Sequence, residues 1–208
     1  MIKRLKYIIN KKSLKDKRYE YLFEDKDYNE LVSLDLETTG LNPKKDEILS
    51  IGAVKIRENE ILLNESLELF VKPTKKIGKK SIEIHHIRPC DLENAIGIEE
   101  AIKKLLDFIG GRRLVGYYIR FDHKMISKYT KKIIGCKLPN KTIELSSLYY
   151  KRKRKSSAYE FVDLKFDTIL KELDLPRLYK HDALNDAVMS AIMYLKLKSI
   201  PEYKGVYS

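Results

Sequence analysis

Residues 31–40 read LVSLDLETTG, an apolar run that ends in two acidic side chains and a turn. Because side chains alternate between the two faces of a β-strand, Asp35 and Glu37 share a face with Ser33. The opposite face takes the apolar residues Val32, Leu34 and Leu36. Two neighbouring carboxylates repel each other unless they share a hard cation such as Mg²⁺ or Mn²⁺. The stretch therefore indicates either a metal site that needs further carboxylates, or simply a strand at whose end Asp35 or Thr38 opens a turn.

Two more β-rich runs follow this strand, ILSIGAVKI at residues 48–56 and ILLNESLELFVKP at residues 61–73. Turn-forming Gly, Asn, Pro and Lys separate the three runs, which predicts an antiparallel meander. Further along, apolar residues recur with helical period in IEEAIKKLLDFIG at residues 98–110. A short apolar strand, RLVGYY at residues 113–118, precedes another helix within residues 121–134.

The last part of the chain contains a basic loop, KRKRKSSAY at residues 151–159, and predicted helices around residues 166–175 and within residues 183–199. A meander followed by alternating strands and helices predicts an α/β fold with a mixed central sheet flanked by helices. This order matches the ribonuclease H-like architecture.

Residues 1–30 are dense in charge and tyrosine. Apolar residues recur there at roughly helical spacing, namely Leu5, Ile8, Ile9 and Leu14. We predict a basic, helical N-terminal arm over residues 1–30 and one catalytic domain over residues 31–208. Because every motif lies beyond the arm, we expect the arm to be separable from the catalytic domain.

The chain has 208 residues and a formal net charge of +12, from 42 Lys and Arg against 30 Asp and Glu. Such a charge attracts polyanions, and nucleic acid is the leading candidate, although solvated surface lysines would give the same excess. No apolar run is long enough for a membrane span, and the basic N-terminus does not read as a secretory signal, so we expect a cytoplasmic protein. Cys90 and Cys136 lack a CxxC partner, which argues against a disulfide framework or a thiolate zinc site.

Further acidic candidates are Asp122, directly after the strand-like LVGYY, and Asp186, inside the helical text of residues 183–199. Each also fits an ordinary role, Asp122 as a helix N-cap and Asp186 as a solvated helix position. His181 stands five residues before Asp186, a spacing that would splay the two by about 140° on one helix. We therefore expect His181 on the loop before that helix, where it can face the same pocket.

Three motifs, taken together, resemble those of the DnaQ-like (DEDDh) 3′-to-5′ exonuclease superfamily, which includes the epsilon proofreading subunit of bacterial DNA polymerase III and ribonuclease T. They are SLDLETTGLNP with DEILSIGAVKI (residues 33–56), LVGYYIRFD (residues 114–122) and HDALNDA (residues 181–187). The resemblance covers about residues 31–197, and SIEIHHI at residues 81–87 is similar to the family's IHGI stretch. The His-x4-Asp spacing favours the DEDDh branch, because the DEDDy branch has Tyr at the position of Asp182.

The resemblance implies five catalytic residues: Asp35, Glu37, Asp122, His181 and Asp186. It implies one Mg²⁺ or Mn²⁺ held by Asp35, Glu37 and Asp186, and a second held by Asp35 and Asp122. His181 would take the proton of the attacking water, and the product would be a nucleoside 5′-monophosphate.

The resemblance also implies that Thr38 and Leu41 contact the terminal nucleotide. Tyr117 and Tyr118 stand where family members commonly carry His-Asn, and they either stack on a base or pack as core. His85 has either a structural or a peripheral substrate role. Three residues of the basic loop form either a phosphate track or a solvated surface, namely Arg152, Lys153 and Arg154.

The expected substrate is a single-stranded or frayed 3′ end of nucleic acid, with DNA favoured over RNA, in proofreading or end trimming. A DNA polymerase is a candidate partner. Two alternatives stay open, an RNA 3′-end-processing exoribonuclease and a non-catalytic nucleic-acid-binding module with a nuclease-like fold.

Overall fold

The computed structural model describes residues 2–24, 29–154, 161–178 and 181–200. In chain order they form α1 (Ile2–Lys12), the 3-10 segment η1 (Lys17–Phe23), β1 (Glu30–Thr38), β2 (Ile48–Arg57), β3 (Glu60–Phe70), α2 (Lys79–His85), the 3-10 segment η2 (Pro89–Leu92), α3 (Ile98–Ile109), β4 (Arg113–Gly116), α4 (Ile119–Ile133), β5 (Thr142–Glu144), α5 (Leu145–Arg154), α6 (Phe166–Glu172) and α7 (Ala183–Ser199).

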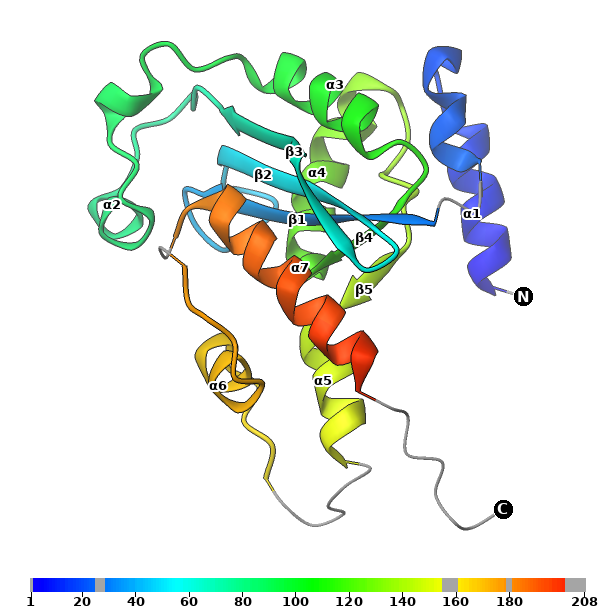
Figure 1. The fold of residues 1–208 in the computed structure, drawn as a ribbon. Coiled ribbons are helices and arrows are strands. Elements are labelled where there is room, and N and C mark those ends of the chain that lie inside the picture. Colours follow the sequence, from blue (N-terminus) through cyan, green and yellow to red (C-terminus); the bar gives the residue numbers. More distant parts are fainter. Residues whose placement is uncertain (1, 25–28, 155–160, 179–180, 201–208) are drawn as a thin grey trace.

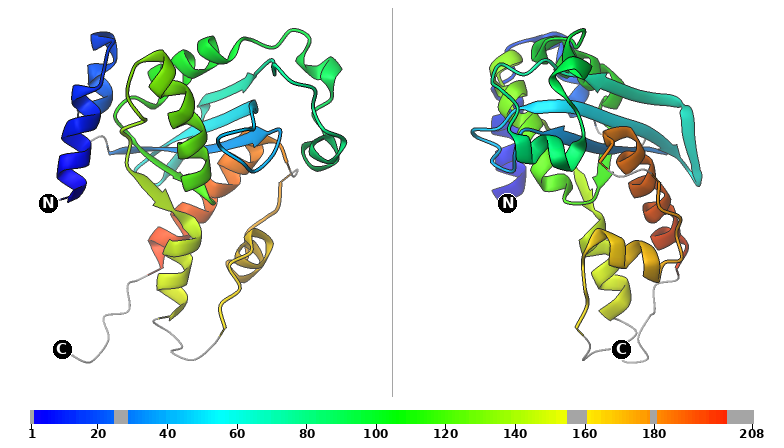
Figure 2. Two further views of the ribbon diagram at one scale, coloured as in Figure 1. Left: turned by 180° about the vertical axis from the view of Figure 1, so that it is seen from behind. Right: turned by 90° about the vertical axis from the view of Figure 1, so that its left-hand side faces the viewer.

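The strands form one sheet in the order β3-β2-β1-β4-β5 (Figure 1). The β1–β2 and β2–β3 pairs are antiparallel, whereas β4 pairs with β1 and β5 with β4 in parallel. The predicted meander and mixed sheet are thus confirmed. Helices cover both faces, with α3 and α4 on one side and α7 on the other (Figure 2).

The alternation of β1 sets which side chains meet each layer. Val32, Leu34 and Leu36 are buried in the core that also contains apolar side chains of α3 and α4. On the other face of the sheet, Val54 and Ile56 of β2 pack in a second core with residues of α7. Asp35 and Glu37 therefore project from β1 toward the α7 side, as the strand pattern predicts.

The N-terminal segment contains the predicted helix, α1, and its described side chains remain outside the buried core. The segment after α1 behaves differently, because it contributes four buried residues to the larger core: Leu14, Tyr19, Leu22 and Phe23. The Tyr7 hydroxyl joins the two parts by donating to the Phe23 carbonyl at 2.6 Å. The division into an arm and a catalytic domain at residue 30 stays a prediction.

The predicted basic loop is wrong at its start, because residues 151–154 form the end of α5. The sequence LSSLYYKRKR contains neither Gly nor Pro, and Leu145 and Tyr149, four residues apart, are both buried against the second core. Residues 155–159 of that prediction lie outside the described residues.

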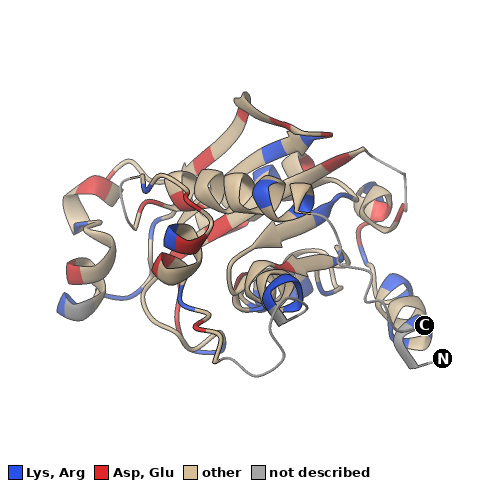
Figure 3. Ribbon diagram, turned by 60° about the horizontal axis from the view of Figure 1, so that its bottom comes forward, with Lys and Arg blue, Asp and Glu red and all other residues tan. Residues whose placement is uncertain are grey.

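Lys and Arg residues occur along α1 and at the end of α5, two separate places on the molecule (Figure 3). Within the described part of the chain, no helix combines the length and apolar character that a membrane crossing requires.

Candidate active site

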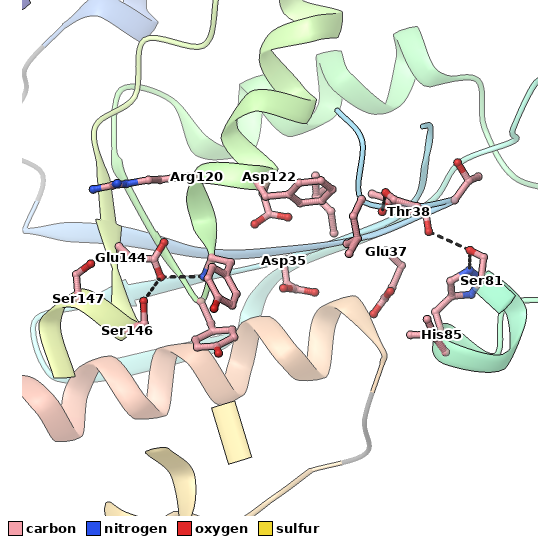
Figure 4. Close-up of a pocket in the computed structure, with 18 residues that line it drawn as sticks. Asp35, Glu37, Thr38, Ser81, His85, Arg120, Asp122, Glu144, Ser146 and Ser147 are labelled. Atoms are coloured by element: carbon pink, nitrogen blue, oxygen red, sulfur yellow. Dashed lines mark hydrogen bonds between the residues drawn. The ribbon is translucent and has the colours of Figure 1, made fainter. Parts of the chain in front are cut away.

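A cavity of about 760 Å³ opens at the carboxyl end of β1, between α2, the first turn of α4 and the start of α5. Its lining includes Asp35, Glu37, Thr38, Leu41, Ser81, His85, Tyr117, Tyr118, Arg120, Asp122, Glu144, Ser146 and Ser147. Figure 4 shows Ser81 and His85 at one end, and Arg120, Glu144 and Ser147 at the other. Asp35, Glu37 and Asp122 lie around the end of β1, between these two ends of the cavity.

A second cavity of about 400 Å³ adjoins the first and shares Asp35 and Tyr117 with it. His181 and Asp186 line this second cavity, together with residues at the start of α6. All five residues expected to be catalytic therefore line one connected cleft, although they come from β1, α4, α7 and the loop before α7.

Two glycines allow these elements to approach Asp35. Gly52 is the β2 partner of Asp35, and a Cβ on it would lie 2.1 Å from the Ala183 carbonyl carbon, so the first turn of α7 rests directly on β2. On the other side, a Cβ on Gly116 would lie 2.7 Å from the Leu34 carbonyl oxygen. Glycine at both positions lets α7 and the end of β4 close in on the acidic end of β1.

Asp122 lies in the first turn of α4 and is only 4% exposed. The N-cap of this helix is Tyr118, not Asp122 as one alternative had it, and Tyr118 has a left-handed backbone (φ 55°). The Glu144 carboxylate accepts the Tyr118 backbone N–H at 2.8 Å and the Ser146 hydroxyl at 3.1 Å. Glu144 thus holds the turn that delivers Asp122 to the cleft.

The acidic cluster is electrostatically costly in the metal-free protein. Burial raises the pKa of Asp35 well above its usual value, and the charges of Asp122, Glu37 and Asp186 raise it further. Burial also raises the pKa of Asp122, with smaller contributions from Glu144 and Glu37. For Glu37, burial and then Asp186 and Asp182 raise the pKa to about 8. Such a cluster is stabilised when cations compensate the carboxylates.

His181 lies on the loop before α7, as predicted, with a left-handed backbone (φ 58°). Its backbone N–H donates to an Asp186 carboxylate oxygen at 3.2 Å. Glu37, His181 and Asp186 each offer a potential ligand atom, and these atoms lie within 4.8 Å of one another. The predominance of carboxylate oxygens suits Mg²⁺ or Mn²⁺, so the residues present fit the expected metal ions.

The residues expected to contact the terminal nucleotide also line the cleft. Leu41 is 87% exposed and Tyr118 is 61% exposed, so both present apolar surface at the rim. Tyr117 is partly buried: its ring packs on Phe166 with centroids 5.0 Å apart, and its hydroxyl donates to the Leu164 carbonyl at 2.8 Å. Tyr117 thus packs against its neighbours and Tyr118 is exposed at the rim, while stacking on a base stays a prediction.

His85 is buried and belongs to a short hydrogen-bond chain. Its Nδ1 accepts the Ile87 backbone N–H at 3.0 Å, so Nε2 carries the proton and donates to the Ser81 hydroxyl at 2.6 Å. That hydroxyl donates in turn to the Thr38 carbonyl at 3.1 Å. Burial lowers the pKa of His85, which keeps the ring neutral. This chain of hydrogen bonds fixes the backbone of Thr38, directly after Glu37.

The basic residues of α5 whose side chains the structure describes, Lys151, Arg152 and Lys153, line neither cavity. Lys153 instead pairs with Glu172 of α6. Arg152 is also on α5, while the side chain of Arg154 lies outside the described residues. A phosphate track by these three residues stays a prediction, without the loop geometry that suggested it.

Among the cleft residues that sequence reasoning missed are Ser81, Arg120, Glu144 and Lys165. A signal existed for Glu144, because it ends the short strand that pairs in parallel with β4. Since the carboxyl ends of parallel strands gather at one edge of a sheet, an acidic residue there was a candidate.

Comparison with known proteins gives one family match: residues 32–194 match the model of the RNase T exonuclease family. The PolC-type DNA polymerase III of Thermotoga petrophila is 31% identical over 188 residues, which are 90% of this chain and 13% of that protein. The chain therefore spans only a small part of the PolC-type relatives. The DNA polymerase III epsilon subunit of Aquifex aeolicus is 28% identical over 169 residues, covering 80% of this chain and 79% of that one.

Among solved structures, E. coli exonuclease I in complex with a dT13 oligonucleotide superimposes with a TM-score of 0.69 at 14% identity. The match covers 82% of this chain and 41% of exonuclease I. At this identity the likeness establishes a shared exonuclease fold, in agreement with the ribonuclease H-like architecture expected from the order of strands and helices.

Proposed function

The chain belongs to the RNase T family of exonucleases, and from that premise we propose that it releases nucleoside 5′-monophosphates from single-stranded or frayed 3′ ends of nucleic acid, with DNA preferred over RNA. One observation carries the proposal. Three segments far apart in the sequence bring Asp35, Glu37, Asp122, His181 and Asp186 to a single cleft. Solvated acidic residues would not converge in this way, and burial would oppose their charge without a chemical use.

Asp35, Glu37 and Asp186 would hold one Mg²⁺ or Mn²⁺ in this cleft, and Asp35 with Asp122 would hold a second. Two such ions supply charge stabilisation for an in-line displacement at phosphorus. The chain contributes a rigid arrangement of the ligands: Asp35 and Glu37 are fixed by the β1–β2 pair, Asp122 by the first turn of α4, and Asp186 by the seat of α7 on Gly52.

His181 is the proposed general base. It lies within reach of the carboxylates and projects from a loop rather than from α7, so its ring faces the cleft that Asp186 also lines. A neutral imidazole can accept a proton near neutral pH, whereas carboxylates that bind cations cannot do so without giving up that role. His181 would therefore remove the proton of the attacking water.

The 3′ end of the bound nucleic acid would lie in the larger cavity. The His85–Ser81 chain fixes the Thr38 backbone, where we place the terminal 3′-hydroxyl. Leu41 and Tyr118, both exposed at the rim, would pack against the last bases, a contact that tolerates any base because every base has an apolar face.

Support for DNA comes from the relatives, which are named as DNA polymerase III components, and from exonuclease I, whose structure was solved with a DNA oligonucleotide. On the same grounds we propose that the chain works with a DNA polymerase. A cytoplasmic location stays a prediction from sequence.

Substrate choice can be tested with 5′-labelled single-stranded DNA, mispaired duplex DNA, matched duplex DNA and RNA, all at one salt concentration. We expect stepwise shortening from the 3′ end, fastest on single-stranded and mispaired DNA. Faster shortening of RNA would reverse the proposed preference. Tight binding of all four without release would favour the non-catalytic binding module instead.

A further inference from the structure

Lys165 lies at the start of α6, on the wall of the smaller cavity that faces Asp35, His181 and Asp186. It is the N-cap residue of this helix, with an extended backbone. Lys165 belongs to none of the three motifs, because it lies between the second motif, which ends at residue 122, and the third, which begins at residue 181.

The backbone of Lys165 is held on both sides by Tyr117. The Tyr117 hydroxyl donates to the carbonyl of Leu164, the preceding residue, at 2.8 Å, and the Tyr117 ring packs on Phe166, the following residue. In addition, the Lys165 backbone N–H donates to Asp163 at 3.1 Å. The fixed backbone sets the point from which the Lys165 side chain leaves α6, and 83% of that side chain is exposed to solvent.

The ammonium group of Lys165 is weakly engaged. Its nearest carboxylate oxygen, on Asp163, lies 3.9 Å away and already accepts the Thr168 hydroxyl at 2.8 Å. Arg177, the other strongly basic residue of this cavity, pairs with Asp167. Among the described residues that line this cavity, Lys165 is therefore the strong cation that can turn to an incoming anion.

The cavity is lined on its other side by Asp35, His181, Asp186 and Ser190, so within the described residues its positive charge comes from the segment of α6 and the residues just after it. We propose that Lys165 binds the terminal phosphodiester, and that Tyr117 is the positioning residue that aims it. This inference rests on the proposed exonuclease function, because it takes the 3′ terminal linkage to lie over Asp35. It also gives a role to Tyr117, which stands where family members commonly carry His.

The test measures binding of 5′-labelled oligothymidylates with Ca²⁺ in place of Mg²⁺, so that turnover is slow. Three oligonucleotides are compared: one with all phosphodiesters, one with a neutral methylphosphonate at the terminal linkage, and one with it at the second linkage. Lys165→Gln should weaken binding of the first and third by about 10- to 150-fold, the range of one hydrogen bond to a charged group. It should have no effect on the second, in which the partner charge is absent.

Two further variants separate charge from structure. Lys165→Arg should restore most of the affinity, and Lys171→Gln, which removes the same charge from an exposed position of α6, should bind like the wild type. Tyr117→Phe, which loses the hydroxyl bound to Leu164, should weaken binding of the all-phosphodiester strand, and it should add little once Lys165 is Gln.

An equal loss on all three oligonucleotides, or the same loss with Lys171→Gln, would overturn the assignment of Lys165 to one phosphate. If the wild type releases mononucleotides from DNA with Mg²⁺ while Lys165→Gln binds normally, this inference fails and the proposed function stands. If the wild type binds these strands through Lys165 but never releases nucleotides, the proposed function fails and the binding site stands. A wild type that binds none of the strands contradicts both.

Discussion

Gly52 and Ala183 lie so close that a Cβ on Gly52 would come within 2.1 Å of the Ala183 carbonyl carbon. Gly52 is the strand partner of Asp35, and Ala183 begins the helix that carries Asp186. The absence of one side chain therefore sets the separation between two of the residues proposed to bind metal.

Gly52→Ala should damage both stability and turnover. The obstacle is backbone, which cannot swing aside, so we expect a loss of about 1–3 kcal/mol in the free energy of unfolding, as for overpacking in general. Displacement of α7 by an ångström should lower turnover by roughly 10²-fold. Gly97→Ala is the matched control for turnover, because a Cβ there meets nothing within 4 Å and the change only weakens the N-cap of α3. Normal melting and turnover of Gly52→Ala would show that the contact between Gly52 and the first turn of α7 does not determine the geometry of the site.

The parts of this structure that sequence could predict are those governed by local periodicity. The alternation in LVSLDLETTG correctly places Asp35 and Glu37 opposite the core residues of β1. The angular spacing of His181 and Asp186 correctly places His181 on a loop. Each of these predictions needs only the geometry of a single strand or helix.

The residues that sequence missed act through contacts between distant segments. Glu144 matters because it caps the Tyr118 turn, and Lys165 because Tyr117 holds its neighbours from 47 residues away. The wrong basic loop has a similar cause. The charged residues 151–154 have no strong local helix signal. They are helical because Leu145 and Tyr149, earlier in the same helix, are buried against the second core.

Two deletions test how the N-terminal segment contributes. Removing residues 1–12 should leave the protein folded, since the described α1 side chains lie outside the core. Removing residues 1–28 also takes away Leu14, Tyr19, Leu22 and Phe23, which are buried in the main core. At roughly 1.5–3 kcal/mol for each buried side chain, this deletion should prevent stable folding. Thermal melts decide the matter, and a stable, active protein lacking residues 1–28 would support the separable arm predicted from sequence.

The raised pKa of Glu37 predicts an unusual pH dependence of stability in chelator. Between its ordinary value and about 8, the folded state holds a proton that the unfolded state has lost, so stability falls as pH rises through this window. Glu37→Gln should therefore raise the melting temperature at pH 8 more than at pH 5. Mn²⁺ should raise that of the wild type most at the higher pH. A mutant that melts below the wild type at pH 8 in chelator would contradict the electrostatic account.

His181→Ala should separate proton transfer from binding. Loss of a general base typically lowers turnover by about 10²- to 10⁴-fold, and the acidic limb of the pH–rate profile should move or disappear. Affinity for single-stranded DNA should change little. His86→Asn is the control, because His86 is exposed at the end of α2 and lines neither cavity. Normal turnover with an unchanged acidic limb would remove His181 from the mechanism.

The central claim is that the carboxylates around Asp35 make this chain a metal-dependent 3′ exonuclease. The most direct measurement is release of nucleoside 5′-monophosphates from a single-stranded DNA, with Mg²⁺ or Mn²⁺ and with chelator, by the wild type and by Asp35→Asn of matched fold. We predict release by the wild type only when the metal is present, and a loss of nearly all activity in Asp35→Asn. Equal release by the two proteins, or release that persists in chelator, would contradict the account.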